Sequence, residues 1–151
     1  FNLTDLSTPE LVAELDLGRS VSRVSADHGL AAVSAENGIA LVDLSDPAHP
    51  WEVAALPIPA HAGLLLSLVG RQAVFSEVDR LSLLDVSNPD RPTVLSQFWT
   101  GSSTSSMTQR GSRVAVGLSD WTIVVIDVGC VPMFRDDFES GGLWAWSEVV
   151  P

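Results

Sequence analysis

One short motif returns along this chain at a nearly constant interval. It is clearest in residues 43–50, Asp-Leu-Ser-Asp-Pro-Ala-His-Pro, and its leading aspartate stands at Asp5, Asp43, Asp85 and Asp127. The last two steps between these aspartates are equal in length, and the first step is slightly shorter. A period of roughly 40 residues indicates a repeat architecture, in which each unit is one small group of secondary-structure elements.

The repeated aspartates are interpreted as the ends of strands. Apolar runs over residues 39–42, 81–84 and 123–126 each stop at one of them. An aspartate carboxylate can accept a hydrogen bond from the backbone N–H two residues further on, and the serine and proline that follow favour a turn. A repeated metal site is the alternative, but no second carboxylate or histidine stands at a constant offset from each aspartate.

A second marker runs alongside the first. Gly29, Gly70 and Gly111 are equally spaced along the chain, and a strand-like segment follows each, which predicts a tight hairpin at each glycine. Further turn residues at 36–38, 78–80 and 119–121 divide each unit again. Three turns give four strands in each unit, and in the second unit these strands are expected over residues 51–58, 62–69, 72–78 and 81–86. The last two are almost continuously apolar, as in strands that are covered on both faces.

A succession of four-stranded antiparallel sheets, each packed on the next, is a β-propeller. We therefore predict an all-β fold: an open arc of about three and a half blades over residues 1–129 and a short irregular tail over residues 130–151. A helical solenoid is the competing architecture, but β-branched runs separated by Gly, Asn and Pro are typical of strands. Because Phe1 stands in the middle of a repeat, we expect an N-terminal portion to be missing.

Composition narrows the classes of partner. The net charge is −11, from 8 arginines, no lysine and 19 acidic residues, which argues against a nucleic-acid partner. The longest apolar run, residues 63–70, is far shorter than the roughly 18 residues of a transmembrane helix. The single cysteine, Cys130, gives no disulfide framework.

Residues with catalytic or binding chemistry are few. His28, His49 and His61 stand at three different positions of the repeat, so no metal or cofactor is predicted. The serine-rich run over 102–106 lacks a nucleophile elbow and is expected to pack in a strand beside a central channel. Trp99 is a candidate platform for a protein or glycan ligand, with packing at a strand end as the equal alternative. Two further tryptophans are assigned to packing: Trp51 and Trp121.

The repeats resemble those of a known family. Residues 39–47 and 81–89, with Gly70 and the Ala73-Val74 pair in phase, are similar to the LVIVD repeat of bacterial and archaeal propeller proteins. The resemblance covers residues 1–129 and implies a secreted or surface-exposed propeller, often joined to interchangeable C-terminal anchors, with no established catalytic residues. The first copy departs from the pattern because its loop lacks about three residues.

The tail resembles a second known pattern. Its matching residues are those of the short segment that closes many otherwise unrelated secreted bacterial proteins: Phe138, Glu139, Ser140, Gly141, Trp146 and Ser147. This resemblance implies a sorting or envelope-anchoring signal, although Leu143 and Trp144 depart from the usual small polar residues. The alternative is a disordered end, or a strand that covers the edge of the last blade. Calcium binding by the acidic residues at 136, 137 and 139 is disfavoured, since their spacing differs from that of a calcium loop.

The function expected from these features is that of a non-enzymatic extracytoplasmic binding or scaffold module, secreted or on the cell surface, with an unknown protein or glycan ligand. One alternative is a hydrolase or lyase whose site uses residues of missing blades. The other is a passive structural spacer on the cell surface.

Overall fold

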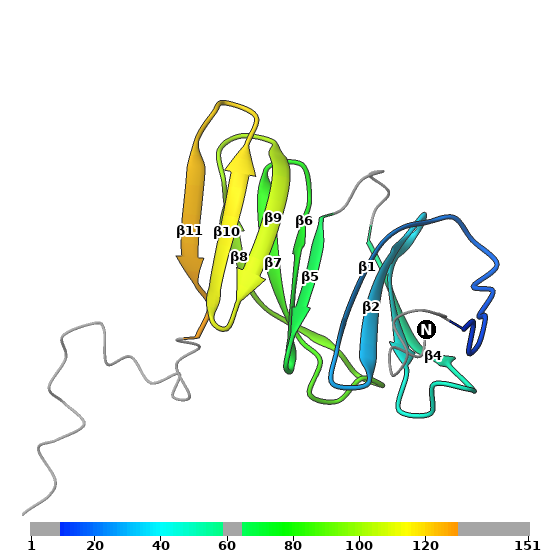
Figure 1. Ribbon diagram of the computed structural model, residues 1–151. Coiled ribbons are helices and arrows are strands. Elements are labelled where there is room, and N and C mark those ends of the chain that lie inside the picture. The colour runs from blue at the N-terminus through cyan, green and yellow to red at the C-terminus, as the bar shows by residue number, and fades with distance from the viewer. Residues whose placement is uncertain (1–9, 59–64, 130–151) are drawn as a thin grey trace, which may run out of the picture.

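The structure of the chain is a computed structural model that describes residues 10–58 and 65–129, and these residues form eleven β-strands and no helix (Figure 1). The strands are β1 (Val21–Asp27), β2 (Leu30–Ala35), β3 (Gly38–Asp43), β4 (Trp51–Pro57), β5 (Leu66–Val69), β6 (Gln72–Ser76), β7 (Arg80–Asp85), β8 (Thr93–Trp99), β9 (Thr104–Arg110), β10 (Arg113–Leu118) and β11 (Ile123–Asp127). None of the described residues forms a helix long and apolar enough to cross a membrane.

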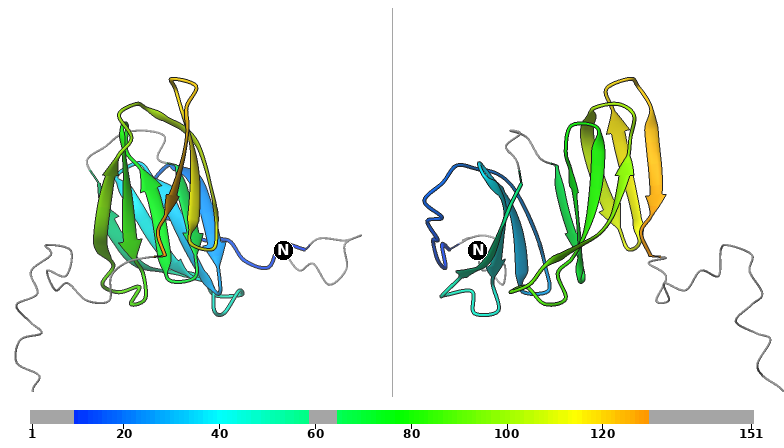
Figure 2. Two further views of the ribbon diagram at one scale, coloured as in Figure 1. Left: turned by 90° about the vertical axis from the view of Figure 1, so that its left-hand side faces the viewer. Right: turned by 180° about the vertical axis from the view of Figure 1, so that it is seen from behind.

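The strands make three antiparallel sheets. The first has the order β1-β2-β3-β4, the second β5-β6-β7-β8, and the third consists of β9, β10 and β11. The three sheets stand side by side in chain order, and their first strands, β1, β5 and β9, contact one another from sheet to sheet (Figures 1 and 2). This is an open arc of propeller blades, as the repeat pattern predicts. The strand expected before Asp5 lies outside the described residues.

The boundaries between sheets differ from those that the repeat pattern predicts. Residues 51–58 are expected to open the second unit, yet β4 is the fourth strand of the first sheet and pairs with β3. β8 completes the second sheet in the same way. The proline-bearing loops after Asp43 and Asp85 therefore turn the chain back within a sheet, and the chain passes to the next sheet only after β4 and β8.

This arrangement explains the continuous apolar runs. They form β2 and β3 in the first sheet and β6 and β7 in the second, which are the middle strands and are buried along most of their length. Side chains from both faces of these strands must pack against neighbours, so alternation of apolar and polar residues disappears.

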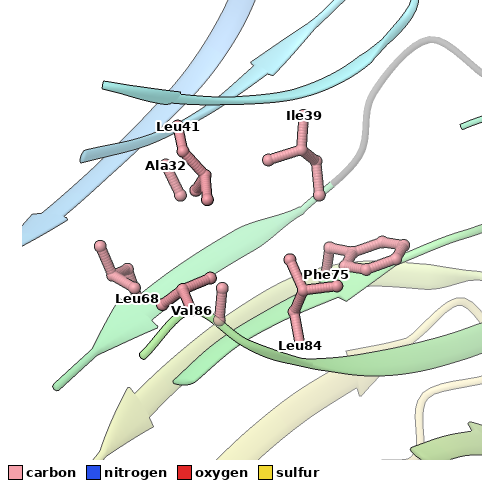
Figure 3. Close-up of a cluster of buried hydrophobic side chains, with 8 residues drawn as sticks. Ala32, Ile39, Leu41, Leu68, Phe75, Leu84 and Val86 are labelled. Carbon is pink, nitrogen blue, oxygen red and sulfur yellow. The ribbon is translucent and has the colours of Figure 1, made fainter. Parts of the chain in front are cut away.

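The core lies between the sheets. Figure 3 shows the cluster between the first two sheets, which contains Ala32, Ile39, Leu41, Leu68, Ala73, Phe75, Leu84 and Val86. A second cluster joins the second and third sheets: Val74, Leu81, Leu83, Val114, Val116 and Leu118. Each fully buried Leu, Ile or Val contributes roughly 1.5–3 kcal/mol to stability, so these contacts between sheets hold the arc together.

The third and fourth strands pair in the same register in the first two sheets. Gly38 pairs with Pro57 between β3 and β4, and Arg80 pairs with Trp99 between β7 and β8. Both ladders shift at the same place, after Leu41 in the first sheet and after Leu83 in the second. Residues of the first two sheets can therefore be compared position by position.

Candidate functional site

Three of the repeated aspartates, Asp43, Asp85 and Asp127, are the last residues of the third strand in their sheets and accept a hydrogen bond from the turn that follows. The acceptor is Oδ1 of the aspartate in each case, and the donor is the backbone N–H two residues further on. The pairs are Asp43 with Ser45 at 2.7 Å, Asp85 with Ser87 at 2.8 Å and Asp127 with Gly129 at 2.9 Å. Each carboxylate thus satisfies a donor that the strand ladder leaves free. Asp5 lies outside the described residues.

These hydrogen bonds also stabilise the charged carboxylates. The Ser45 hydroxyl, followed by the Ser45 backbone N–H, holds the pKa of Asp43 below its ordinary value. Ser87 lowers the pKa of Asp85 in the same two ways. Among the described residues no group of three or more His, Cys, Asp or Glu side chains is arranged to hold a metal ion.

The three marker glycines lie in hairpins between the first two strands of each sheet, but at two different positions. Gly70 and Gly111 are the first turn residues, with φ of 60° and 56°. Gly29 is the second turn residue, with φ of 79°, and His28 takes the first position with φ of 47°. Both residues of the first hairpin are thus left-handed, a conformation typical of a type I′ turn. Although the three glycines are equally spaced in the sequence, Gly29 therefore lies one position later in its hairpin than Gly70 and Gly111 do in theirs.

Trp99 is the one candidate ligand platform on the described part of the chain that the sequence singles out. It ends β8, the outer strand of the second sheet, and the residue is 62% exposed. The Arg80 guanidinium carbon lies 4.3 Å from the centre of the indole ring, a cation–π contact. The structure therefore supplies a partner, Arg80, that the sequence gives no reason to choose, because cross-strand register alone brings it to Trp99.

Two further side chains hold Arg80 over the indole. Its Nη1 donates to Oε1 of Gln97 at 3.3 Å, and its Nε lies 3.4 Å from Oε2 of Glu77. Gln97 is itself anchored, because its Nε2 donates to the Ser82 hydroxyl at 3.1 Å. The result is an exposed flat ring with a fixed cation on it and polar groups beside it, which can stack on a ligand and hydrogen-bond to its edge.

The two tryptophans assigned to packing are both exposed in the described part of the chain. Trp51 begins β4 and is also exposed. The packing interpretation is wrong for Trp121, a residue that the described part of the chain leaves 97% exposed. It lies in the turn between β10 and β11 with a φ of 70°, a left-handed conformation that is uncommon for a residue other than glycine.

The serine-rich run enters β9, the inner strand of the third sheet. Its hydroxyls bond locally: Ser105 Oγ donates to the Gly117 carbonyl at 2.9 Å, and the Ser102 and Ser119 hydroxyls lie 3.0 Å apart. The candidate tail residues cannot be placed in the same way, because Phe138, Glu139, Ser140, Gly141 and Trp146 lie outside the described residues.

No protein-family model and no curated protein matches the sequence. Solved structures do resemble the fold. The computationally designed Ika4 protein has a TM-score of 0.58 at 15% identity, covering 72% of this chain and 66% of that one. The designed Ika8 protein has a TM-score of 0.59 at 15% identity, covering 73% of this chain and 34% of that one.

A third similar structure is that of S. cerevisiae Dbp5 bound to Nup159, with a TM-score of 0.56 at 13% identity, covering 74% of this chain and 32% of that one. This chain thus spans just under two thirds of Ika4 and about a third of the other two chains. At these identities the likenesses concern the fold alone. Together with the topology of the three sheets, they identify the chain as an all-β fragment of propeller type.

Proposed function

We propose that this chain is part of an extracytoplasmic propeller of the LVIVD-repeat type, which works as a non-enzymatic binding or scaffold module. The proposal places a protein or glycan ligand at Trp99. The observation that supports it best is the exposed indole with Arg80 fixed 4.3 Å from its centre.

An exposed tryptophan that is already held by its neighbours suits binding. Trp and Arg are enriched among the few residues that dominate binding energy at protein surfaces. A ring that is ordered before the ligand arrives loses less conformational entropy on binding. The flat apolar face can stack on a sugar ring or on a peptide side chain, while Gln97 and Glu77 offer polar contacts nearby.

The test is a binding screen with a matched tryptophan control. The purified chain is applied to a glycan array and to a phage-displayed peptide library, and each ligand found is titrated against Trp99→Ala and Trp121→Ala. Both tryptophans are exposed, but of the two only Trp99 has an arginine on its ring within the described part of the chain. Loss of a central anchor of about 2 kcal/mol weakens binding roughly 30-fold, so this loss is expected for Trp99→Ala and not for Trp121→Ala.

Two results would count against the proposal. A wild-type chain that binds nothing in either library would favour a passive spacer. A ligand that Trp99→Ala binds as tightly as the wild type would place any binding site elsewhere on the molecule.

A further inference from the structure

The first sheet has a hollow at the position where the second sheet carries the Arg80–Trp99 pair. The hollow has a volume of about 160 Å³, and it opens over Gly38, Ala55 and Pro57, with Arg19 among its walls. Gly38 and Pro57 form the cross-strand pair that corresponds to Arg80 and Trp99, one sheet earlier.

The hollow exists because small residues replace large ones. Pro57 stands where the second sheet has Trp99, and Ala55 stands where it has Gln97. No side chain can fill the space from position 38, since a Cβ on Gly38 would overlap the carbonyl oxygen of Leu56. The strands of the first sheet therefore have no counterparts of the Arg80, Gln97 and Trp99 side chains that occupy this position in the second sheet.

A guanidinium nevertheless reaches this position from another part of the chain. Arg19 lies in the segment before β1, and its Nη2 is 2.8 Å from Oε2 of Glu52 on β4. Its Nη1 donates to the Leu17 carbonyl at 3.4 Å. Arg80 is held in the same manner, by Glu77 and Gln97, and there the ring of Trp99 stacks on it. In both sheets the guanidinium is held by one ion pair with a glutamate and one hydrogen bond to an oxygen, although Nη2 of Arg19 and Nε of Arg80 make no hydrogen bond within the described residues. A guanidinium so held offers its flat face for stacking.

We propose that this hollow is a second binding site, which takes a neutral aromatic side chain of a peptide partner and stacks it on Arg19. The volume suits one ring, since an apolar cavity of roughly 150 Å³ accommodates benzene. The walls formed by Ile39, Leu56 and Pro57 offer apolar contact to the ring. An anionic ligand is disfavoured, because Glu52 already neutralises Arg19 and the whole chain carries a charge of −11.

This site is independent of the one proposed at Trp99, and the experiment separates the two. The probe is N-acetyl-4-fluorophenylalanine amide, a neutral peptide-like molecule with a single aromatic ring, titrated into the full 151-residue chain and followed by ¹⁹F NMR. Free N-acetyl-4-fluorophenylalanine, which carries a carboxylate, serves as the anionic comparison. Saturable binding of the amide is expected, with weaker binding of the acid.

Two kinds of variant test the geometry. Arg19→Ala removes the stacking cation and is expected to weaken binding of the amide about fivefold, the equivalent of about 1 kcal/mol. Pro57→Trp installs the residue that fills the corresponding position in the second sheet, so it is expected to abolish binding while the chain remains folded, as thermal melts would show. Ala55→Gln, which adds the counterpart of Gln97, is expected to weaken binding without touching Arg19.

Trp99→Ala is the control and is expected to bind the probe like the wild type. The inference is overturned if the amide does not saturate the wild-type chain, or if Arg19→Ala and Pro57→Trp bind it unchanged. It is also overturned if only Trp99→Ala loses binding, a result that would instead support the site proposed at Trp99.

Discussion

The backbone N–H of Gly70 donates a hydrogen bond of 2.6 Å to Oδ2 of Asp27, although the two residues belong to different sheets. Ser25, two residues before Asp27 in β1, makes a similar contact: its hydroxyl oxygen accepts a hydrogen bond of 2.9 Å from the Leu68 N–H. β5 pairs with β6 on one side only, so the Leu68 N–H belongs to its free edge, and Gly70 is the turn residue directly after this strand. Side chains of β1 therefore satisfy backbone groups of the neighbouring sheet and supplement the apolar contacts between the two.

Acid should weaken this junction. The Gly70 N–H, followed by the His28 side chain, holds the pKa of Asp27 below its ordinary value of about 3.9. A carboxyl group with a depressed folded pKa contributes stability that is complete above its unfolded pKa and is lost as pH falls through the folded pKa. Wild type is thus expected to lose more stability between pH 5 and pH 3 than Asp27→Asn, which keeps an oxygen acceptor but cannot titrate.

Urea unfolding at several pH values measures this difference. The comparison is repeated in a His28→Gly background, because glycine suits the φ of 47° at that position and removes the neighbouring imidazole. Parallel pH profiles for wild type and Asp27→Asn, in both backgrounds, would show that the carboxylate does not support the junction.

Local signals in the sequence account for most of the fold and little of the candidate site. The aspartate turns and glycine hairpins each depend on a few adjacent residues, so they can be predicted from short motifs that recur along the sequence. The division into sheets depends on which strand β4 joins, and sequence spacing alone leaves that choice open. The contact of Arg80 with Trp99 and that of Asp27 with Gly70 depend on register and on packing between sheets, which no short pattern encodes.

Removal of a repeated aspartate carboxylate should lower the stability of the fold slightly and should have no effect that depends on calcium. Asp85→Ala loses the hydrogen bond to the Ser87 N–H, so its free energy of unfolding is expected to fall by about 1 kcal/mol. Asp90→Ala is the matched control, because Asp90 is exposed in the same loop and its backbone N–H, which the substitution keeps, makes the bond there to Asn88. Calcium should leave the melting temperature of the wild type unchanged. A calcium-dependent rise that Asp85→Ala abolishes would instead assign the aspartate to a metal site.

The tail is expected to determine location and to leave the stability of the blades unchanged. Residues 134–151 contain two glycines in succession, an acidic cluster and two tryptophans, with too little apolar periodicity to form a blade. Deletion of these residues, in a protein that carries its native N-terminus, should leave the unfolding midpoint nearly constant and change the cell fraction in which the protein accumulates. Thermal melts and fractionation test both halves of the prediction. A large fall in melting temperature with an unchanged distribution would identify the tail as a packing element.

Two buried leucines of the second sheet have counterparts in the third that the described residues leave mostly exposed. Leu81 and Leu83 are 3% and 6% exposed because they pack on the third sheet. Ile123 and Val125, which stand at the same positions before the next repeated aspartate, are left 74% and 63% exposed by the described residues.

Equal truncations at the two positions should therefore have unequal costs. Leu81→Ala removes buried side-chain volume and is expected to lower the free energy of unfolding by about 2–4 kcal/mol. Ile123→Ala removes a similar side chain from an open face and should change it by less than about 1 kcal/mol. Urea unfolding of the 151-residue chain measures both. Equal losses at the two positions would mean that the outer face of the third sheet is covered in the intact chain, because only a buried isoleucine loses that much on truncation.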